Sequence, residues 1–207
     1  MQYAPTNPSE IVMADDNVNR QRHSLRLADY DYSQAGAYFV TLSVHDRACL
    51  FGEVVDGVTR LKKHGHVITS EWLRTPVLRP QVALDEFVVM PNHFHAIIAI
   101  EDSRRGVLPY AHPRFQSPSQ TVGAVIRGFK SATTKQINES RGTAGAAVWQ
   151  RNYYEHVIRN DDELTRIREY IANNPFQWSL DRENPQKGVY QYAPTDGIES
   201  IFGGIRP

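Results

Sequence analysis

Two histidines, His93 and His95, lie two positions apart in an apolar stretch that runs from residue 87 to residue 100. The stretch has the composition of a buried strand, and in a strand residues i and i+2 point to the same face. The two imidazoles would then project together, with their Cα atoms about 7 Å apart, while Phe94 anchors the opposite face. Two imidazoles held in this way supply half of a metal site.

A core histidine is more often a hydrogen-bonded structural residue, so the spacing alone leaves metal binding and a structural role equally open. The apolar surroundings favour a partner for each ring, because burying two unsatisfied imidazoles is costly. A second pair, His64 and His66, falls where a helix is expected to begin. Positions i and i+2 do not face each other on a helix, so we interpret these two as solvated or capping residues.

Tyr170 and Asn174 form a second group of chemical interest near the end of a predicted helix. They are four residues apart and therefore share one helix face. Leu164, Ile167 and Ile171 define the buried stripe of that helix, and Tyr170 and Asn174 lie along its border. A site against a sheet would be built at such a border. The alternative is an amphipathic tyrosine whose ring fills the core edge while its hydroxyl stays in water.

The elements that would carry these residues follow from periodicity and turn signals. In chain order we predict a strand at 37–44, a hairpin at 51–61 turning at Asp56-Gly57, a helix at 66–73, strands at 82–90 and 93–100, a surface loop at 102–118, a helix from Ser119 or Thr121 to about residue 139, an extended segment at 148–158, and a helix that opens at 161–163 and stops at 173–175. This order predicts an α+β, ferredoxin-like (RRM-like) sandwich with helices packed on a largely antiparallel sheet. His93 and His95 would lie on a central strand.

Composition narrows the class of protein. The 207 residues, 41% of them hydrophobic, suffice for one domain. The single cysteine, Cys49, excludes an internal disulfide framework and a cysteine-based zinc cluster. We find neither a membrane-spanning run nor a signal peptide and therefore expect a cytoplasmic protein.

The formal net charge is zero, which counts modestly against a nucleic-acid partner, but the charge is unevenly distributed. Between residues 119 and 159 six Lys and Arg face two Glu, and a second basic segment lies at 20–26. Both segments neighbour tyrosines, as single-strand binders require, although most charge clusters are only solvated faces. The cations of these two segments include Arg22, Arg26, Arg127, Lys130 and Arg151.

In four ordered blocks the chain resembles the single-tyrosine HUH (IS200-like) transposases, and most closely the REP-associated tyrosine transposases. The resemblance spans roughly residues 24–178, and its histidine and tyrosine blocks together are far more specific than either alone. The blocks are residues 30–41, 86–95, 149–154 and 167–175.

The resemblance implies a role for each candidate residue. His93 and His95 would be the two metal ligands of the His-hydrophobic-His motif, and Tyr170 the nucleophile on its helix. Asn174 falls where relatives place an amide that completes the site for Mg²⁺ or Mn²⁺, although theirs is commonly glutamine. Tyr153 and Tyr154 are rival nucleophiles, but they precede the motif helix.

The implied activity is DNA transposition through a 5′-phosphotyrosine intermediate on single-stranded or hairpin DNA of the REP type. In this role Arg127, Lys130 and Arg151 would contact phosphates, and Arg22 and Arg26 of the basic N-terminal segment would contact the hairpin. The implied organisation is a basic arm at 1–25, a catalytic domain at 26–178 and a tail at 179–207. A related sequence, QYAPT, occurs at residues 2–6 and 191–195 and suggests tails that dock on a symmetric homodimer.

Three alternatives remain open from the sequence. A noncatalytic nucleic-acid binder would keep the basic surfaces without needing the histidines or Tyr170. A cupin-like metalloenzyme would need further ligands, and the carboxylates nearest in sequence are Asp85, Glu86 and Glu101. A structural or interaction protein would show no metal dependence.

Overall fold

The computed structural model describes residues 35–101, 121–181 and 183–185. One four-stranded antiparallel sheet organises them, with strand order β4-β5-β1-β6. Its strands are β1 (Gly36–Ser43), β4 (Val82–Val89), β5 (His93–Ile100) and β6 (Tyr154–Ile158). The predicted α+β sandwich is confirmed, and the strand that carries both histidines lies inside the sheet between β4 and β1.

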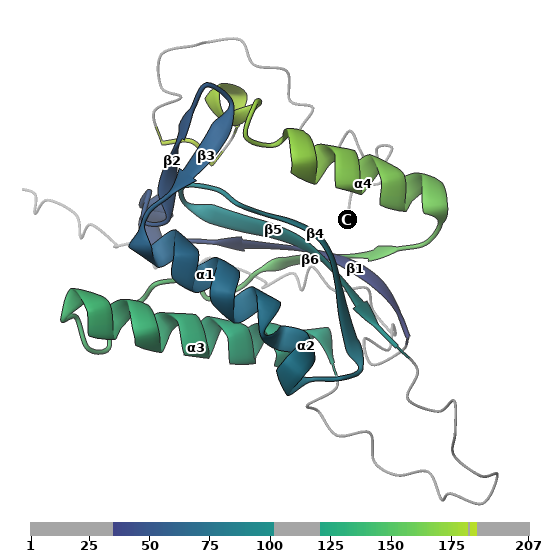
Figure 1. Cartoon of the computed structure of the whole chain (residues 1–207), viewed down its shortest axis with the longest axis horizontal. Coiled ribbons are helices and arrows are strands. Elements are labelled where there is room, and N and C mark those ends of the chain that lie inside the picture. Colours follow the sequence, from purple (N-terminus) through teal and green to yellow (C-terminus); the bar gives the residue numbers. More distant parts are fainter. Residues whose placement is uncertain (1–34, 102–120, 182, 186–207) are drawn as a thin grey trace, which may run out of the picture.

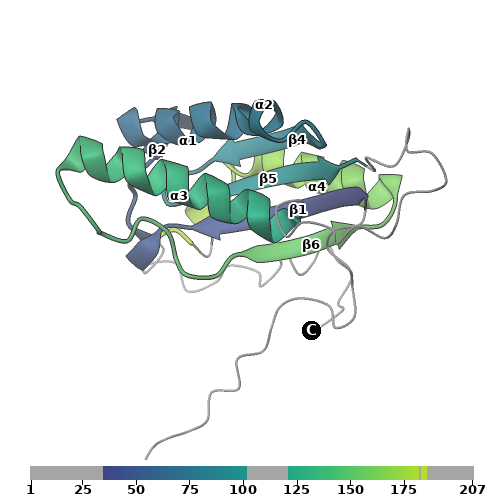
Figure 2. The ribbon, with the colours of Figure 1, turned by 90° about the horizontal axis from the view of Figure 1, so that it is seen from below.

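Helices cover both faces of this sheet (Figure 1). The helices are α1 (Lys63–Leu73), α2 (Thr75–Leu78), α3 (Val122–Arg141) and α4 (Asp161–Asn173), with short 3₁₀ turns η1 (His45–Arg47) and η3 (Trp178–Leu180). Figure 2 shows α1 and α3 over one face, whereas α4 crosses the other. Nothing among the described helices is long and apolar enough to cross a membrane.

The two faces have separate cores because side chains alternate along each strand. Phe94 points toward α1 and α3, where its ring lies 5.0 Å from Trp72 and 5.5 Å from Phe129, measured between centroids. On the other face a smaller cluster joins Phe39 and Ile97 to Ile167 of α4. The larger core fixes the sheet, and the smaller one holds α4 against the strand that bears the histidines.

A separate hairpin, formed by β2 (Gly52–Val55) and β3 (Val58–Leu61), turns at the predicted dipeptide. Asp56 and Gly57 both have positive φ, 53° and 73°, as a tight primed turn requires. The hairpin prediction is therefore confirmed.

Capping residues set the ends of the long helices. The Thr121 hydroxyl accepts a hydrogen bond from the N–H of Ala124 at the start of α3, and Asn160 accepts one from Glu163 at the start of α4. Helix α1 begins three residues earlier than predicted, because the N–H of His66 already bonds to the carbonyl of Lys62. Both His64 and His66 thus lie in its first turn, where His66 is exposed.

The extended segment predicted at 148–158 is a regular strand only from Tyr154 onward. Before it, the ammonium of Lys130 lies within 3.5 Å of the carbonyl oxygens of residues 150, 151 and 152. These oxygens are occupied by a side chain and do not join the ladder. A single bridge between Trp149 and Val44 keeps this stretch next to the sheet.

Candidate active site

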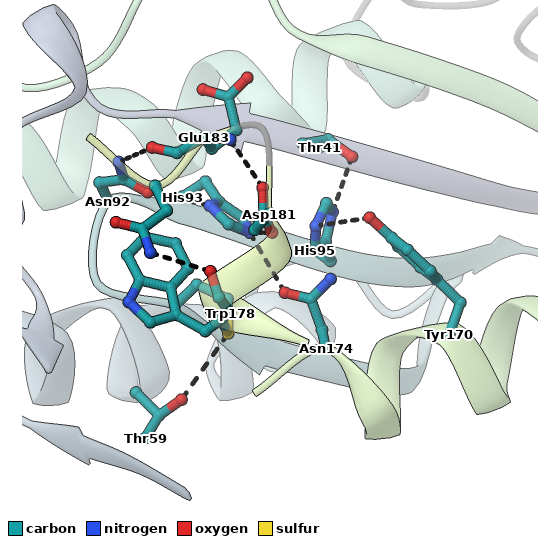
Figure 3. A network of polar contacts seen from close by, with 12 residues as sticks. Thr41, Thr59, Asn92, His93, His95, Tyr170, Asn174, Trp178, Asp181 and Glu183 are labelled. Atoms are coloured by element: carbon teal, nitrogen blue, oxygen red, sulfur yellow. Dashed lines mark hydrogen bonds and ion pairs between the residues drawn. The ribbon is translucent and has the colours of Figure 1, made fainter. Parts of the chain in front are cut away.

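His93 and His95 point from β5 toward α4, as the strand spacing predicts (Figure 3). Their ring centroids are 4.6 Å apart. Both side chains are buried, with exposed fractions of 0% and 2%. Each therefore needs a defined partner for each ring nitrogen, since an unsatisfied buried nitrogen is costly.

His95 is held by the neighbouring strand. Thr41 is its partner in the β1–β5 register, and the Thr41 hydroxyl lies 2.8 Å from Nδ1 of His95. The ring of Phe39 stacks on the imidazole at 5.5 Å with an interplanar angle of 24°. Burial, followed by the nearby His93, lowers the pKa of His95 well below its ordinary value. The ring is accordingly neutral at pH 7.

Both ring nitrogens of His93 have polar neighbours. Nδ1 lies 3.0 Å from Oδ1 of Asn92, and Nε2 lies 3.4 Å from Oδ1 of Asn174 and 3.7 Å from Oδ2 of Asp181. Burial lowers the pKa of His93, and the carboxylates of Asp181 and Glu183 oppose that effect only in part. A neutral imidazole is the form that binds a metal.

Helix α4 brings Tyr170 and Asn174 to the same place. Ile167 and Ile171 are buried against the sheet and set the rotation of the helix. The Tyr170 hydroxyl then lies 3.4 Å from Nε2 of His95, and Phe39 supports the tyrosine ring edge-on at 6.1 Å. Asn174, one turn further along, reaches His93. The structure thus brings together all four residues predicted for catalysis and metal binding.

The predicted DNA contacts that the structure describes do not lie in this group. Arg127 and Lys130 belong to α3, which packs on the opposite face of the sheet, and Arg151 lies in the connection from α3 to β6. The half-buried Lys130 donates to backbone carbonyls, and burial lowers its pKa. Arg22 and Arg26 fall outside the described residues, as do the repeated tails, the arm at 1–25 and most of the tail from residue 179.

The two rival tyrosines have different neighbours. The Tyr153 hydroxyl donates to the carboxylate of Glu155 at 2.7 Å, and its ring packs with the larger core. Tyr154 packs with the smaller cluster, with its ring 6.2 Å from Phe39. Tyr170 is the predicted nucleophile that the structure places against a histidine.

Sequence reasoning missed Asn92 and Asp181. Asn92 lies between the two predicted strands at 82–90 and 93–100, and its position beside His93 was the available signal. Asp181 follows η3 and lies past the predicted boundary at residue 178, where no motif marks it. Of the carboxylates considered from the sequence, Asp85 instead forms an ion pair with Arg168 of α4, which lowers the pKa of Asp85.

A divalent metal would have to bind through a mixed set of atoms. The described part of the chain contains no group of three or more His, Cys, Asp or Glu side chains that could hold an ion. The atoms at hand are the Nε2 atoms of His93 and His95 together with the amide oxygen of Asn174. Two imidazole nitrogens and one amide oxygen form a mixed ligand set for a divalent ion, and each imidazole is also oriented through its Nδ1.

No protein-family model matches the chain. An uncharacterized protein of Haemophilus influenzae is 40% identical over 167 residues, which cover 78% of this chain and 92% of that protein. The chain belongs to the family of this protein.

A second Haemophilus influenzae protein, named "Putative REP-associated tyrosine transposase", is 23% identical over 147 residues, or 70% of this chain and 73% of that protein. A solved REP-associated tyrosine transposase bound to a REP hairpin aligns with a TM-score of 0.45 and 21% identity over 73% of this chain and 74% of that one. The resemblance to REP-associated tyrosine transposases that the motifs predict is confirmed.

Proposed function

We propose that the protein is a metal-dependent tyrosine DNA transesterase that cleaves and rejoins single-stranded or hairpin DNA, as a transposase does. The observation that carries the proposal is the contact between the Tyr170 hydroxyl and His95, beside His93 and Asn174. These residues come from β5 and α4, which are far apart in the chain. A buried pair of neutral imidazoles next to a tyrosine hydroxyl is suited to phosphoryl transfer.

The reaction exchanges one phosphodiester bond for another. The Tyr170 oxygen attacks phosphorus and forms a new P–O bond, while the bond from phosphorus to O3′ breaks. The tyrosine loses its proton, and the departing O3′ gains one. The product is a 5′-phosphotyrosyl ester and a free 3′-OH, so no bond energy is lost to hydrolysis and a second strand can reverse the step.

A tyrosine hydroxyl with a pKa of about 10 is mostly protonated at neutral pH, so its position matters more than its intrinsic reactivity. Phe39 packs against both Tyr170 and His95 and fixes their relative orientation. His93, His95 and Asn174 would hold the metal, which when bound supplies positive charge to the phosphate oxygens.

The name of the second relative supports REP-type DNA as the substrate class. The basic residues of α3 and its following loop, Arg127 and Arg151, are exposed and would meet phosphates of the duplex stem away from the reacting strand. Lys130 is a weaker candidate, because its ammonium already serves three carbonyls.

The proposal is tested by incubating the full chain with a labelled single-stranded hairpin library and Mn²⁺, followed by a denaturing gel for covalent adducts. Wild type should form adducts, whereas Tyr170→Phe and His95→Ala should form none. Tyr153→Phe and Tyr154→Phe are matched controls and should retain the adduct. Hairpin binding without any adduct would reject the proposal and favour a noncatalytic nucleic-acid binder.

A further inference from the structure

The amide of Asn92 has a fixed orientation. Its Nδ2 donates to the carbonyl oxygen of Arg47 at 3.0 Å and to that of Glu183 at 2.6 Å. Both bonds require the NH₂ group, so Oδ1 is the atom that faces His93. Asn92 is fully buried.

This orientation fixes the tautomer of His93. Oδ1 of Asn92 is an acceptor and lies 3.0 Å from Nδ1, so Nδ1 carries the hydrogen. In a neutral ring Nε2 then has only a lone pair. That lone pair points at two oxygen atoms, Oδ1 of Asn174 at 3.4 Å and Oδ2 of Asp181 at 3.7 Å.

The two oxygens are not equivalent. Rotation of the Asn174 amide would turn its NH₂ group toward the lone pair and remove the conflict. No rotation of a carboxylate supplies a donor. Asp181 is moreover held in place, because its Oδ1 accepts the backbone N–H of Glu183 at 2.7 Å and leaves Oδ2 toward His93 (Figure 3).

An ion pair between a charged His93 and Asp181 is a poor description of this contact. A charge-assisted N–H···O bond is about 2.7–2.9 Å long, and the observed separation of 3.7 Å is well beyond it. Atoms that share an octahedral Mg²⁺ at about 2.1 Å stand about 3 Å apart when adjacent and about 4 Å apart when opposite. The distances from Nε2 of His93, 3.4 Å to Asn174 and 3.7 Å to Asp181, fall between these two values. Each oxygen would have to move by about half an ångström to share a cation with Nε2, in keeping with the absence of a ready group of three His, Cys, Asp or Glu ligands among the described residues.

We propose that Asp181 supplies a carboxylate oxygen to a divalent cation bound by His93 and Asn174, with Asn92 as the residue that turns the lone pair of His93 toward that cation. The inference rests on the proposed function only in giving the bound cation a role in DNA cleavage. It adds a charged ligand to a site whose other atoms are neutral, and charge is the main source of affinity for a hard cation.

The test measures Mn²⁺ binding to the full chain without DNA. Binding is detected as the loss of the electron paramagnetic resonance signal of free Mn²⁺. Asp181→Asn keeps the size of the side chain but removes its charge, and its Kd should rise at least about tenfold. Glu101→Gln is the matched control, because the exposed Glu101 follows the end of β5 opposite to His93. Its Kd should stay within about twofold of wild type.

A second variant shows whether Asp181 is a metal ligand or has only a structural role. Asp181→Cys, made in a Cys49→Ser background, places a soft thiolate at the same point and should raise the preference for Cd²⁺ over Mn²⁺ at least about tenfold. Cys49 is exposed and is the chain's single cysteine, so its removal leaves one thiol to interpret. This readout needs no activity, and it also decides the matter if Asp181→Asn does not fold.

Unchanged Mn²⁺ affinity in folded Asp181→Asn, unchanged metal preference in Asp181→Cys, or no Mn²⁺ binding by wild type would each overturn the inference. Failure of the proposed function has a different signature. Wild type would then bind Mn²⁺ through Asp181 and still form no covalent adduct with any hairpin.

Discussion

Thr41→Val tests whether the hydroxyl on β1 supports His95. The substitution preserves the shape and β-branching of the side chain, so packing in the strand is kept. It removes the partner that lies 2.8 Å from Nδ1 of a histidine that is only 2% exposed. A buried polar atom left without a partner costs about 1–3 kcal/mol. With a urea m-value of about 2 kcal/mol/M, a loss of about 2 kcal/mol lowers the unfolding midpoint by about 1 M.

The assay is urea unfolding, monitored by circular dichroism, and it includes two comparison variants. Thr41→Ser keeps a hydroxyl at the same position and loses only a methyl group, so its free energy of unfolding should fall by about 0.8 kcal/mol, less than in Thr41→Val. Thr59→Val removes a hydroxyl whose contact is a weak one to the sulfur of Met90 at 3.7 Å, and it should be nearly neutral. The same Thr41→Val protein should bind Mn²⁺ about 10–100-fold more weakly, because the orientation of His95 is no longer fixed.

If Thr41→Val unfolds at the wild-type urea concentration and binds Mn²⁺ with wild-type affinity, the hydroxyl does not support His95 and the reasoning is refuted. An equal loss in Thr41→Ser and Thr41→Val would also refute it, since the hydroxyl would then not be the cause.

Other predictions concern the elements that carry the site. Asn160→Ala removes the N-cap of α4 and should cost about 1 kcal/mol in urea unfolding; an unchanged midpoint would show that the cap does not matter. Gly52→Ala would place a Cβ 2.5 Å from the carbonyl oxygen of Arg60, so the variant should melt at a lower temperature than wild type, and an equal melting temperature would contradict the close approach. Burial would raise the pKa of Glu163, but hydrogen bonds from Arg159 and His156 outweigh it and lower that pKa in the folded state. Stability from Glu163 is thus present above its unfolded pKa and is lost as the pH falls below about 4.5, so the stability difference between wild type and Glu163→Gln should shrink on acidification; a constant difference would be inconsistent with the shift.

The fold could be predicted from the sequence where local patterns and tertiary packing agree. The strand at His93–Ile100, the turn at Asp56-Gly57 and the cap at Thr121 were each predicted and observed. Periodicity predicted an extended segment at 148–158, but the regular ladder begins only at Tyr154, and the carbonyl oxygens of residues 150–152 face the ammonium of Lys130 from a distant helix. No pattern within that segment encodes this interaction.

The four candidate site residues were predictable because strand and helix periodicities fix which side chains share a face. Their neighbours were not. Asp181 reaches His93 through an irregular segment after α4, and irregular backbone has no period to extrapolate. The charge distribution was informative only in part, since Arg127 proved to lie on the face of the sheet away from the histidines.

The most direct test of the central claim is to map the covalent adduct by mass spectrometry. Wild-type protein is treated with hairpin DNA and Mn²⁺, digested with nuclease and trypsin, and searched for a nucleotide-modified tyrosine. Cleavage after Arg168 and at residue 182 yields a peptide, 169–182, whose single tyrosine is Tyr170, while residues 152–159 carry Tyr153 and Tyr154. We predict the nucleotide on peptide 169–182; a nucleotide on peptide 152–159, or on neither, would contradict the assignment of Tyr170 as the nucleophile.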